Sequence, residues 1–155
     1  MIIRPAQRKD IEAITLLNNI EWKWVSAKTP GFFERYFGAI PVFDVAEERG
    51  LVCGFMMVMD QSTNYNSPNF NWFKQMFGRF LYVDRVVVDE SKKRKGLGTK
   101  FYERLIANRG NTPIVAEVSI EPPNPASIAF HKKLGFRSLG TFSANRHTCN
   151  MYWLG

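Results

Sequence analysis

Residues 86–99 read VVVDESKKRKGLGT and contain the signals on which the fold assignment depends. The three valines end an apolar run that is typical of a buried strand. A charged loop follows, with four successive basic residues at positions 92–95. Gly96 and Gly98 then open a segment with an apolar residue at every fourth position, which predicts a helix over residues 96–108. The sequence therefore predicts a strand, a basic loop and a helix in direct succession.

The start of this helix has the features of a binding site for a phosphate-bearing ligand. The first four N–H groups of a helix have no partner within it, and the macrodipole places partial positive charge there. Glycines at positions 96 and 98 let a phosphate approach the backbone, so the pattern favours a pyrophosphate site. Two better-known phosphate loops do not fit. The chain has no Gly-Lys pair, and the dinucleotide fingerprint requires a third glycine where Phe101 stands.

The remaining segments predict a mixed α/β sheet, because the early strands form a meander and the later strands alternate with helices. Strands are expected at residues 2–4, 42–47, 51–59, 80–88, 114–120, 136–143 and 148–154. Helices are expected at residues 9–19, 31–37, 96–108 and 125–134. Residues 60–78 are rich in asparagine and aromatic residues and have two interpretations. They form either a functional loop or a partly helical excursion that packs its own aromatic side chains.

Composition indicates one globular domain over residues 1–155, with 45% apolar and 23% charged residues. The net charge of +7 favours anionic partners. We expect a cytoplasmic protein without membrane segments, because signal-peptide and long apolar runs are missing. Cys53 and Cys149 lie in apolar stretches and are expected to be buried free thiols, with a nucleophilic Cys149 as the alternative. No metal site is predicted, since His131 and His147 are the only histidines and no Cys-x-x-Cys pair occurs.

A second motif, NPASIAFHKKLGF over residues 124–136, has clear helix signals. Asn124 suits an N-cap, Pro125 the first helical position and Gly135 the left-handed end of a helix. The apolar side chains on one helical face, expected to pack on the sheet, are Ala126, Phe130 and Leu134. The polar stripe beside them, which could line a groove, consists of Asn124, Ser127 and His131.

Together the two motifs resemble the Gcn5-related N-acetyltransferase (GNAT) superfamily. Residues 93–98 align with its Gln/Arg-x-x-Gly-x-Gly/Ala signature, with Lys93 in place of the usual Gln or Arg. Residues 124–136 match its Asn-x-x-Ser/Ala signature with the following Leu-Gly-Phe. Residues 82–88, together with residues 117–136, also resemble a bacterial subgroup of acetyltransferases without an assigned substrate. The resemblance implies an α/β fold with a twisted mixed sheet of about six to seven strands. That sheet would be splayed between its fourth and fifth strands and flanked by about four helices.

The resemblance also implies an activity. The protein would transfer the acetyl group of acetyl-CoA to a primary amine of a small molecule or peptide, by direct attack in a ternary complex. A backbone N–H of residues 86–88 would stabilise the oxyanion, the pyrophosphate would lie over residues 93–99, and Asn124 would reach the pantetheine arm. The residues expected to contact the cofactor are Val86, Val87, Val88, Lys93, Arg94, Lys95, Gly96, Leu97, Gly98, Thr99, Asn124, Ser127, Phe130 and His131.

Three residues are candidates for catalysis. Asp84 and Glu117 stand in the two strands that flank the expected opening, so either could accept the proton of the incoming ammonium. An acid in an apolar strand is costly unless it is paired, so Asp84 has the alternative of a salt bridge with Arg85 or another arginine. His131 stands where many family members have a tyrosine that donates a proton to the thiolate. Its alternative is a solvent-facing helical histidine.

Two other functions are compatible with parts of the sequence. An acyl-CoA-binding sensor with a degenerate active site would explain His131 in place of the tyrosine. A basic nucleic-acid-binding module would use residues 92–95 against phosphates, but it leaves residues 124–136 unexplained. A homodimer is a further alternative to a monomer. The acceptor amine cannot be read from the sequence, because fold alone does not identify a substrate.

Overall fold

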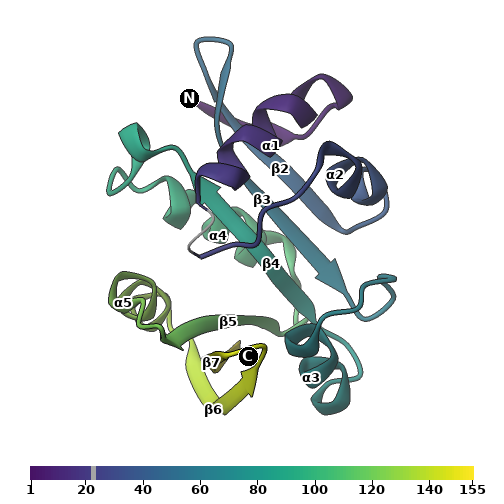
Figure 1. The fold of residues 1–155 in the computed structure, drawn as a ribbon, viewed down its shortest axis with the longest axis vertical. Coiled ribbons are helices and arrows are strands. Elements are labelled where there is room, and N and C mark those ends of the chain that lie inside the picture. The colour runs from purple at the N-terminus through teal and green to yellow at the C-terminus, as the bar shows by residue number, and fades with distance from the viewer. Residues whose placement is uncertain (22–23) are drawn as a thin grey trace. The chain divides into compact units, whose positions relative to one another are not determined.

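The computed structural model describes residues 1–21 and 24–155, which form two compact units (Figure 1). The first unit comprises Met1–Met59 and Val83–Asn108, and the second comprises Asp60–Tyr82 and Arg109–Gly155. No helix in the described part of the chain is both long and apolar enough to span a membrane.

The described residues form seven strands, five α-helices and two short 3-10 helices. The strands are β1 Ile2–Pro5, β2 Val42–Glu48, β3 Leu51–Asp60, β4 Leu81–Val88, β5 Ile114–Glu121, β6 Arg137–Ala144 and β7 His147–Leu154. The helices are α1 Ile11–Ile20, α2 Pro30–Tyr36, α3 Pro68–Met76, α4 Leu97–Asn108 and α5 Pro125–Lys133, with 3-10 helices η1 Arg8–Asp10 and η2 Glu90–Lys92. The strand order in the sheet is β1-β2-β3-β4-β5-β7-β6.

These elements confirm the mixed α/β prediction, and each expected strand and helix is found with ends within two residues of those expected. The fourth and fifth strands form a parallel pair whose register covers Leu81↔Ile114 and Tyr82↔Val115, at the beginning of both strands. Antiparallel pairs join β1 to β2, β2 to β3, β5 to β7 and β6 to β7. The sheet is therefore mixed, as predicted.

The aromatic segment 60–78 contains a helix, α3, so its helical interpretation is confirmed. Ser67 caps the helix by accepting a hydrogen bond from the Phe70 N–H, and Pro68 occupies the first turn. Phe70 and Phe73 are fully buried. The segment thus uses its own aromatic side chains to attach the helix to the sheet.

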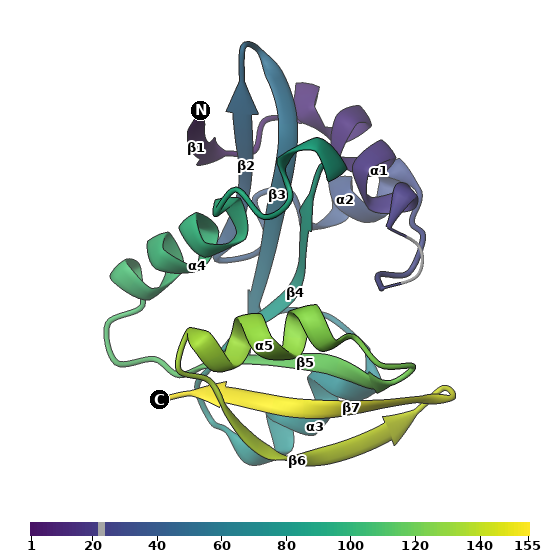
Figure 2. The ribbon, with the colours of Figure 1, turned by 90° about the vertical axis from the view of Figure 1, so that its left-hand side faces the viewer.

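In the first unit, α1 and α2 lie on one face of strands β2 to β4 and α4 lies on the other (Figure 2). Successive side chains of β3 point to opposite faces of the sheet, because side chains alternate along a strand. Phe55 meets Phe33 of α2 edge to face, with ring centroids 5.8 Å apart. Gly54 faces α4, where an added Cβ would lie 3.2 Å from Leu97 Cδ2.

The second unit packs α3 and α5 on opposite faces of its strands. Phe73 of α3 lies 5.8 Å from Tyr82, and Trp72 lies 6.3 Å from Phe142 of β6. On the other face, His131 of α5 stacks on Tyr152 of β7 at 6.0 Å. Tyr82 and Tyr152 are each about 1% exposed, so both contacts belong to the core.

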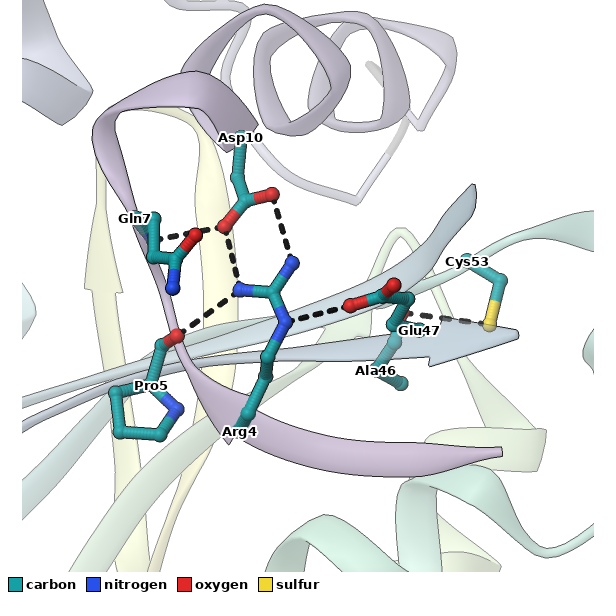
Figure 3. A network of polar contacts seen from close by, with 7 residues as sticks. All are labelled: Arg4, Pro5, Gln7, Asp10, Ala46, Glu47 and Cys53. Carbon is teal, nitrogen blue, oxygen red and sulfur yellow. Dashed lines mark hydrogen bonds and ion pairs between the residues drawn. The ribbon is translucent and has the colours of Figure 1, made fainter. Parts of the chain in front are cut away.

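A polar network fixes the beginning of the chain to the first unit (Figure 3). The Arg4 guanidinium donates to both Asp10 carboxylate oxygens, at 2.8 and 3.0 Å, and to Glu47 Oε2 at 2.6 Å. The Gln7 N–H donates to Asp10 Oδ2 at 2.7 Å. Asp10 is 4% exposed, and the hydrogen bond from Arg4 lowers the pKa of its carboxyl despite the opposing effect of burial. This network therefore joins β1, β2 and the start of α1.

We predict that Asp10→Asn lowers the free energy of unfolding by about 2 kcal/mol at pH 7, because it removes one partner of a largely buried ion pair. The folded-state pKa of Asp10 lies below that of the unfolded chain, about 3.9. Its contribution is therefore present above that value and is lost as the pH falls through the folded-state pKa. Urea unfolding at pH 7 and at acid pH measures both effects.

Glu47→Gln is the matched control, because it removes one negative charge from the same network and leaves the Arg4–Asp10 pair in place. Glu47 is 25% exposed, so its loss should cost less than that of Asp10. An equal decrease in the free energy of unfolding of the two variants at pH 7 would contradict the larger contribution that we assign to Asp10.

Candidate active site

The loop between β4 and α4 leads into the first turn of α4 through a short 3-10 helix and two left-handed residues. Asp89 caps η2 by accepting from the Ser91 N–H at 2.9 Å. Arg94 (φ 63°) and Gly96 (φ 81°) adopt left-handed conformations that turn the chain into the helix. The Gly96 carbonyl accepts from the Lys100 N–H at 3.0 Å, so the preceding N–H groups of the helix have no partner within it.

Two of the four basic residues in this loop are engaged by carboxylates. Lys92 forms an ion pair with Glu48. Lys93 Nζ lies 2.7 Å from Glu21 Oε1, at the end of α1, and 3.0 Å from Glu90 Oε2. Burial lowers the pKa of Lys93, but the two carboxylates outweigh this effect and raise it. Both lysines are therefore held as ammonium ions.

Arg94 and Lys95 are exposed, and among the described residues neither has a carboxylate partner. They stand immediately before Gly96, where the positive end of the helix dipole adds to their charge. An added Cβ at Gly96 would meet no atom within 4 Å, so this face of the loop is open. The arrangement fits a ligand with one or more phosphate groups.

The first carboxylate candidate, Asp84, is paired within β4. Arg85 Nε donates to Asp84 Oδ2 at 2.6 Å, and the two side chains are 4% and 3% exposed. The same guanidinium donates to Asn18 Oδ1 at 2.9 Å and to the Ser26 carbonyl oxygen at 3.3 Å. The salt bridge that the sequence suggested as the alternative role of Asp84 is thus present. It belongs to a buried network that connects β4 with the end of α1.

The second candidate, Glu117 of β5, lies in the other unit. It accepts a hydrogen bond from the Tyr82 hydroxyl at 2.8 Å. Glu117 and Cys149 are near each other, because Ser119 pairs with Cys149 across β5 and β7 and lies two residues from Glu117 on the same face. Burial, and then the Glu117 charge, raise the pKa of Cys149 to about 11. Cys149 is therefore a buried thiol, as Cys53 is, and the alternative of a nucleophilic Cys149 is disfavoured.

Helix α5 begins and ends as predicted. Asn124 Oδ1 accepts from the Ser127 N–H at 3.3 Å, and Gly135 adopts φ 98° after the last turn. The face that packs on the sheet differs from the one expected. Ala126 is exposed, whereas His131 is buried against Tyr152. The predicted apolar face is therefore wrong at Ala126, and part of the polar stripe packs on the sheet.

His131 is 7% exposed, so its interpretation as a solvent-facing residue is wrong. Its Nδ1 lies 2.8 Å from the Ser127 carbonyl oxygen, which only accepts, so Nδ1 carries the proton. Burial lowers the pKa of the imidazole below its ordinary value of 6.5, although the bond to Ser127 opposes this. The ring is neutral at pH 7. A proton-donor role for His131 would require a second proton, which burial disfavours.

The structure thus distributes the predicted residues between its two units. Residues 84–88 and 93–99 lie in the first unit, with Asn124, Ser127, Phe130, His131 and Glu117 in the second. Sequence reasoning missed the contact of Glu21 with Lys93 and that of Tyr82 with Glu117, because partners 72 and 35 residues apart leave no local signal. Among the described residues, no group of three or more His, Cys, Asp or Glu side chains could hold a metal ion.

The model of the acetyltransferase (GNAT) family matches residues 12–136. No curated protein sequence matches the chain. A Staphylococcus aureus N-acetyltransferase is 23% identical, with a TM-score of 0.73 and coverage of 99% of this chain and 96% of that one.

Two further solved structures have the same fold. A Salmonella typhimurium protein described as a putative acetyltransferase with its cofactor acetyl-CoA is 24% identical (TM-score 0.74) and covers 99% of this chain and 92% of its own. A Brucella melitensis ribosomal-protein-alanine N-acetyltransferase is 18% identical (TM-score 0.74) and covers 99% of both chains. At these identities the likeness establishes the fold.

We predict that Glu21→Gln strengthens the binding of inorganic pyrophosphate about two- to fivefold, because an exposed ion pair no longer competes for Lys93. Isothermal titration calorimetry at low salt measures the dissociation constant. Glu12→Gln removes the same charge from the same helix and should change the affinity less. An equal increase in the affinity for pyrophosphate in the two variants would show a general charge effect. It would contradict competition between Glu21 and pyrophosphate for Lys93.

Proposed function

Because the chain belongs to the acetyltransferase (GNAT) family, whose model covers residues 12–136, we propose that it transfers the acetyl group of acetyl-CoA to a primary amine. The acceptor is a small molecule or a peptide, and its amine attacks the thioester directly within a ternary complex. The chain is thus an acyltransferase that uses acetyl-CoA, and the nature of the acceptor and the order of events are the proposal.

The observation that carries the proposal is the start of α4. Coenzyme A carries a pyrophosphate, and the loop offers helix N–H groups, Arg94, Lys95 and the open face of Gly96. Helix N-termini with glycine at the point of approach bind such groups without further side-chain ligands. The residues present therefore fit the cofactor that the family uses.

We assign the oxyanion to a backbone N–H of residues 86–88 at the end of β4. Attack by the amine converts the planar thioester carbonyl into a tetrahedral oxyanion, which a fixed N–H stabilises more than it stabilises the starting carbonyl. The C–S bond then breaks, and the electron pair leaves with sulfur. A fixed backbone donor suits this role because it does not have to reorganise during the reaction.

We assign the removal of the ammonium proton to Glu117 rather than to Asp84. Asp84 is held by Arg85 at 2.6 Å with both side chains almost completely buried, so its charge is already matched. Glu117 accepts a hydrogen bond from the Tyr82 hydroxyl, and it stands in the other strand that flanks the expected opening.

We predict that acetyl-CoA raises the melting temperature of the protein, and that Gly96→Ala abolishes this rise. A ligand at ~100 times its dissociation constant stabilises a fold by about 2.7 kcal/mol. Gly50→Ala is the matched control, because Gly50 also has a positive φ, 79°, and no atom within 4 Å of an added Cβ. Each substitution costs about 1 kcal/mol of backbone strain.

The response to acetyl-CoA should therefore be lost only in Gly96→Ala. The absence of any shift in the unsubstituted protein would overturn the proposed function. A shift without turnover on any amine would instead support the acyl-CoA-binding sensor.

We predict that Glu117→Gln lowers kcat about 100-fold at neutral pH, and that alkaline pH restores part of the rate by deprotonating the amine in solution. Asp84→Asn leaves Arg85 buried without its counter-charge. It should lower the melting temperature by several degrees and reduce kcat less than Glu117→Gln does. The measurement is a pH profile of kcat for each folded variant. If Glu117→Gln kept the pH profile of the unsubstituted protein and Asp84→Asn lost the pH dependence of kcat, the base would be Asp84.

A further inference from the structure

Lys28 is held in a fixed position by the end of α1. Its N–H donates to Asn19 Oδ1 at 2.9 Å, and its carbonyl oxygen accepts from Asn19 Nδ2 at 3.0 Å. Two residues earlier, the Ser26 carbonyl oxygen accepts from Asn18 Nδ2 at 3.0 Å and from Arg85 Nη1 at 3.3 Å. These hydrogen bonds hold the backbone of Ser26 and Lys28 against α1 and, through Arg85, against β4.

The Lys28 side chain lies over an aromatic ring that it shares with a second cation. Lys28 Nζ is 4.5 Å from the centroid of the Phe32 ring, and Arg85 Cζ is 5.0 Å from the same centroid. Burial and the Arg85 charge lower the pKa of Lys28, while Asp84 opposes them. The neutral amine, which is the form that attacks a thioester, is therefore more populated at Lys28 than in an ordinary lysine.

Among the described residues of this unit, the pKa of two other lysines is shifted, and in the opposite direction. Lys92 and Lys93 lie in the loop assigned to the pyrophosphate, but carboxylates raise the pKa of each. They remain protonated and are poor nucleophiles. Lys28 instead shares the Phe32 ring with Arg85. Arg85 directly precedes residues 86–88 of β4, to which the oxyanion is assigned.

We propose that Lys28 is a site of self-acetylation, at which the protein transfers the acetyl group of its bound acetyl-CoA to its own Lys28 amine. This inference rests on the proposed function. The Lys28 nitrogen bonds to the carbonyl carbon and the C–S bond breaks. The electron pair leaves as the CoA thiolate, which takes up the proton that the nitrogen loses. The products are Nε-acetyl-Lys28 and CoA, and no oxidant or metal is needed.

The first test is incubation of the full chain with acetyl-CoA, followed by peptide mass spectrometry of each lysine. Lys74 is the internal control, because its Nζ also lies over an aromatic ring, 5.8 Å from the centroid of Phe70. Lys28 should be acetylated roughly tenfold faster than Lys74 or more. The rate per molecule should not depend on protein concentration. A rate equal to that of Lys74, or one proportional to protein concentration, would overturn self-acetylation.

Two variants separate the position of Lys28 from cofactor binding. Asn19→Ala, at an exposed position, releases the backbone of Lys28 and should slow its acetylation severalfold while leaving Lys74 unchanged. Gly96→Ala should prevent acetylation of Lys28 by acetyl-CoA. An unchanged Lys28 rate in both variants would indicate ordinary chemical acetylation and overturn the proposal.

A parallel reaction with trace acetic anhydride reports the reactivity of each amine without any cofactor site. Preferential labelling of Lys28 by acetyl-CoA that Gly96→Ala abolishes, while labelling by anhydride is unchanged in that variant, supports the proposal. Preferential labelling by anhydride alone overturns self-acetylation. If acetyl-CoA still raises the melting temperature in that case, the proposed function stands. If it does not, the proposed function fails as well, so the two failures are distinguishable.

Discussion

The position of α4 depends on one close approach, over Gly54 of β3. A Cβ at this residue would lie 3.0 Å from the Val87 carbonyl oxygen, 3.2 Å from Leu97 Cδ2 and 3.4 Å from Phe101 Cε2. The first turn of α4 can therefore rest on the backbone of β3 only because position 54 has no side chain. Since the direction of the free helix N–H groups follows the helix axis, the geometry of the phosphate loop depends on this contact.

Much of the fold could be predicted because its signals are local. Asn124, Pro125 and Gly135 define the ends of α5 within the sequence of that helix, and the valines at 86–88 define the end of β4. The start of α3 also had a local signal, Ser67 followed by Pro68, which a search for N-caps within the aromatic segment would have found. Local chemistry of this kind does not depend on what the segment packs against.

The faces and partners could not be predicted, because they are decided by residues far away in the chain. The sheet-facing side of α5 is set by the stacking of His131 on Tyr152, which lies in another strand. Apolar periodicity alone would choose Ala126, which is exposed. Similarly, the position of Lys28 depends on the hydrogen bond from Arg85 to Ser26. No sequence motif in residues 24–36 predicts this position. Sequence thus locates the candidate residues, while tertiary contacts decide what each can do.

The charge of the phosphate loop illustrates this difference. Four basic residues in a row suggest a strong general attraction for anions, yet Lys92 and Lys93 are matched by Glu48, Glu21 and Glu90. An incoming pyrophosphate must compete with these pairs for the same ammonium groups. Arg94, Lys95 and the helix N–H groups provide the attraction that remains. Such a loop binds polyanions in general more weakly than a loop with four unpaired basic side chains would. It favours a ligand whose phosphates reach the N-terminus of the helix.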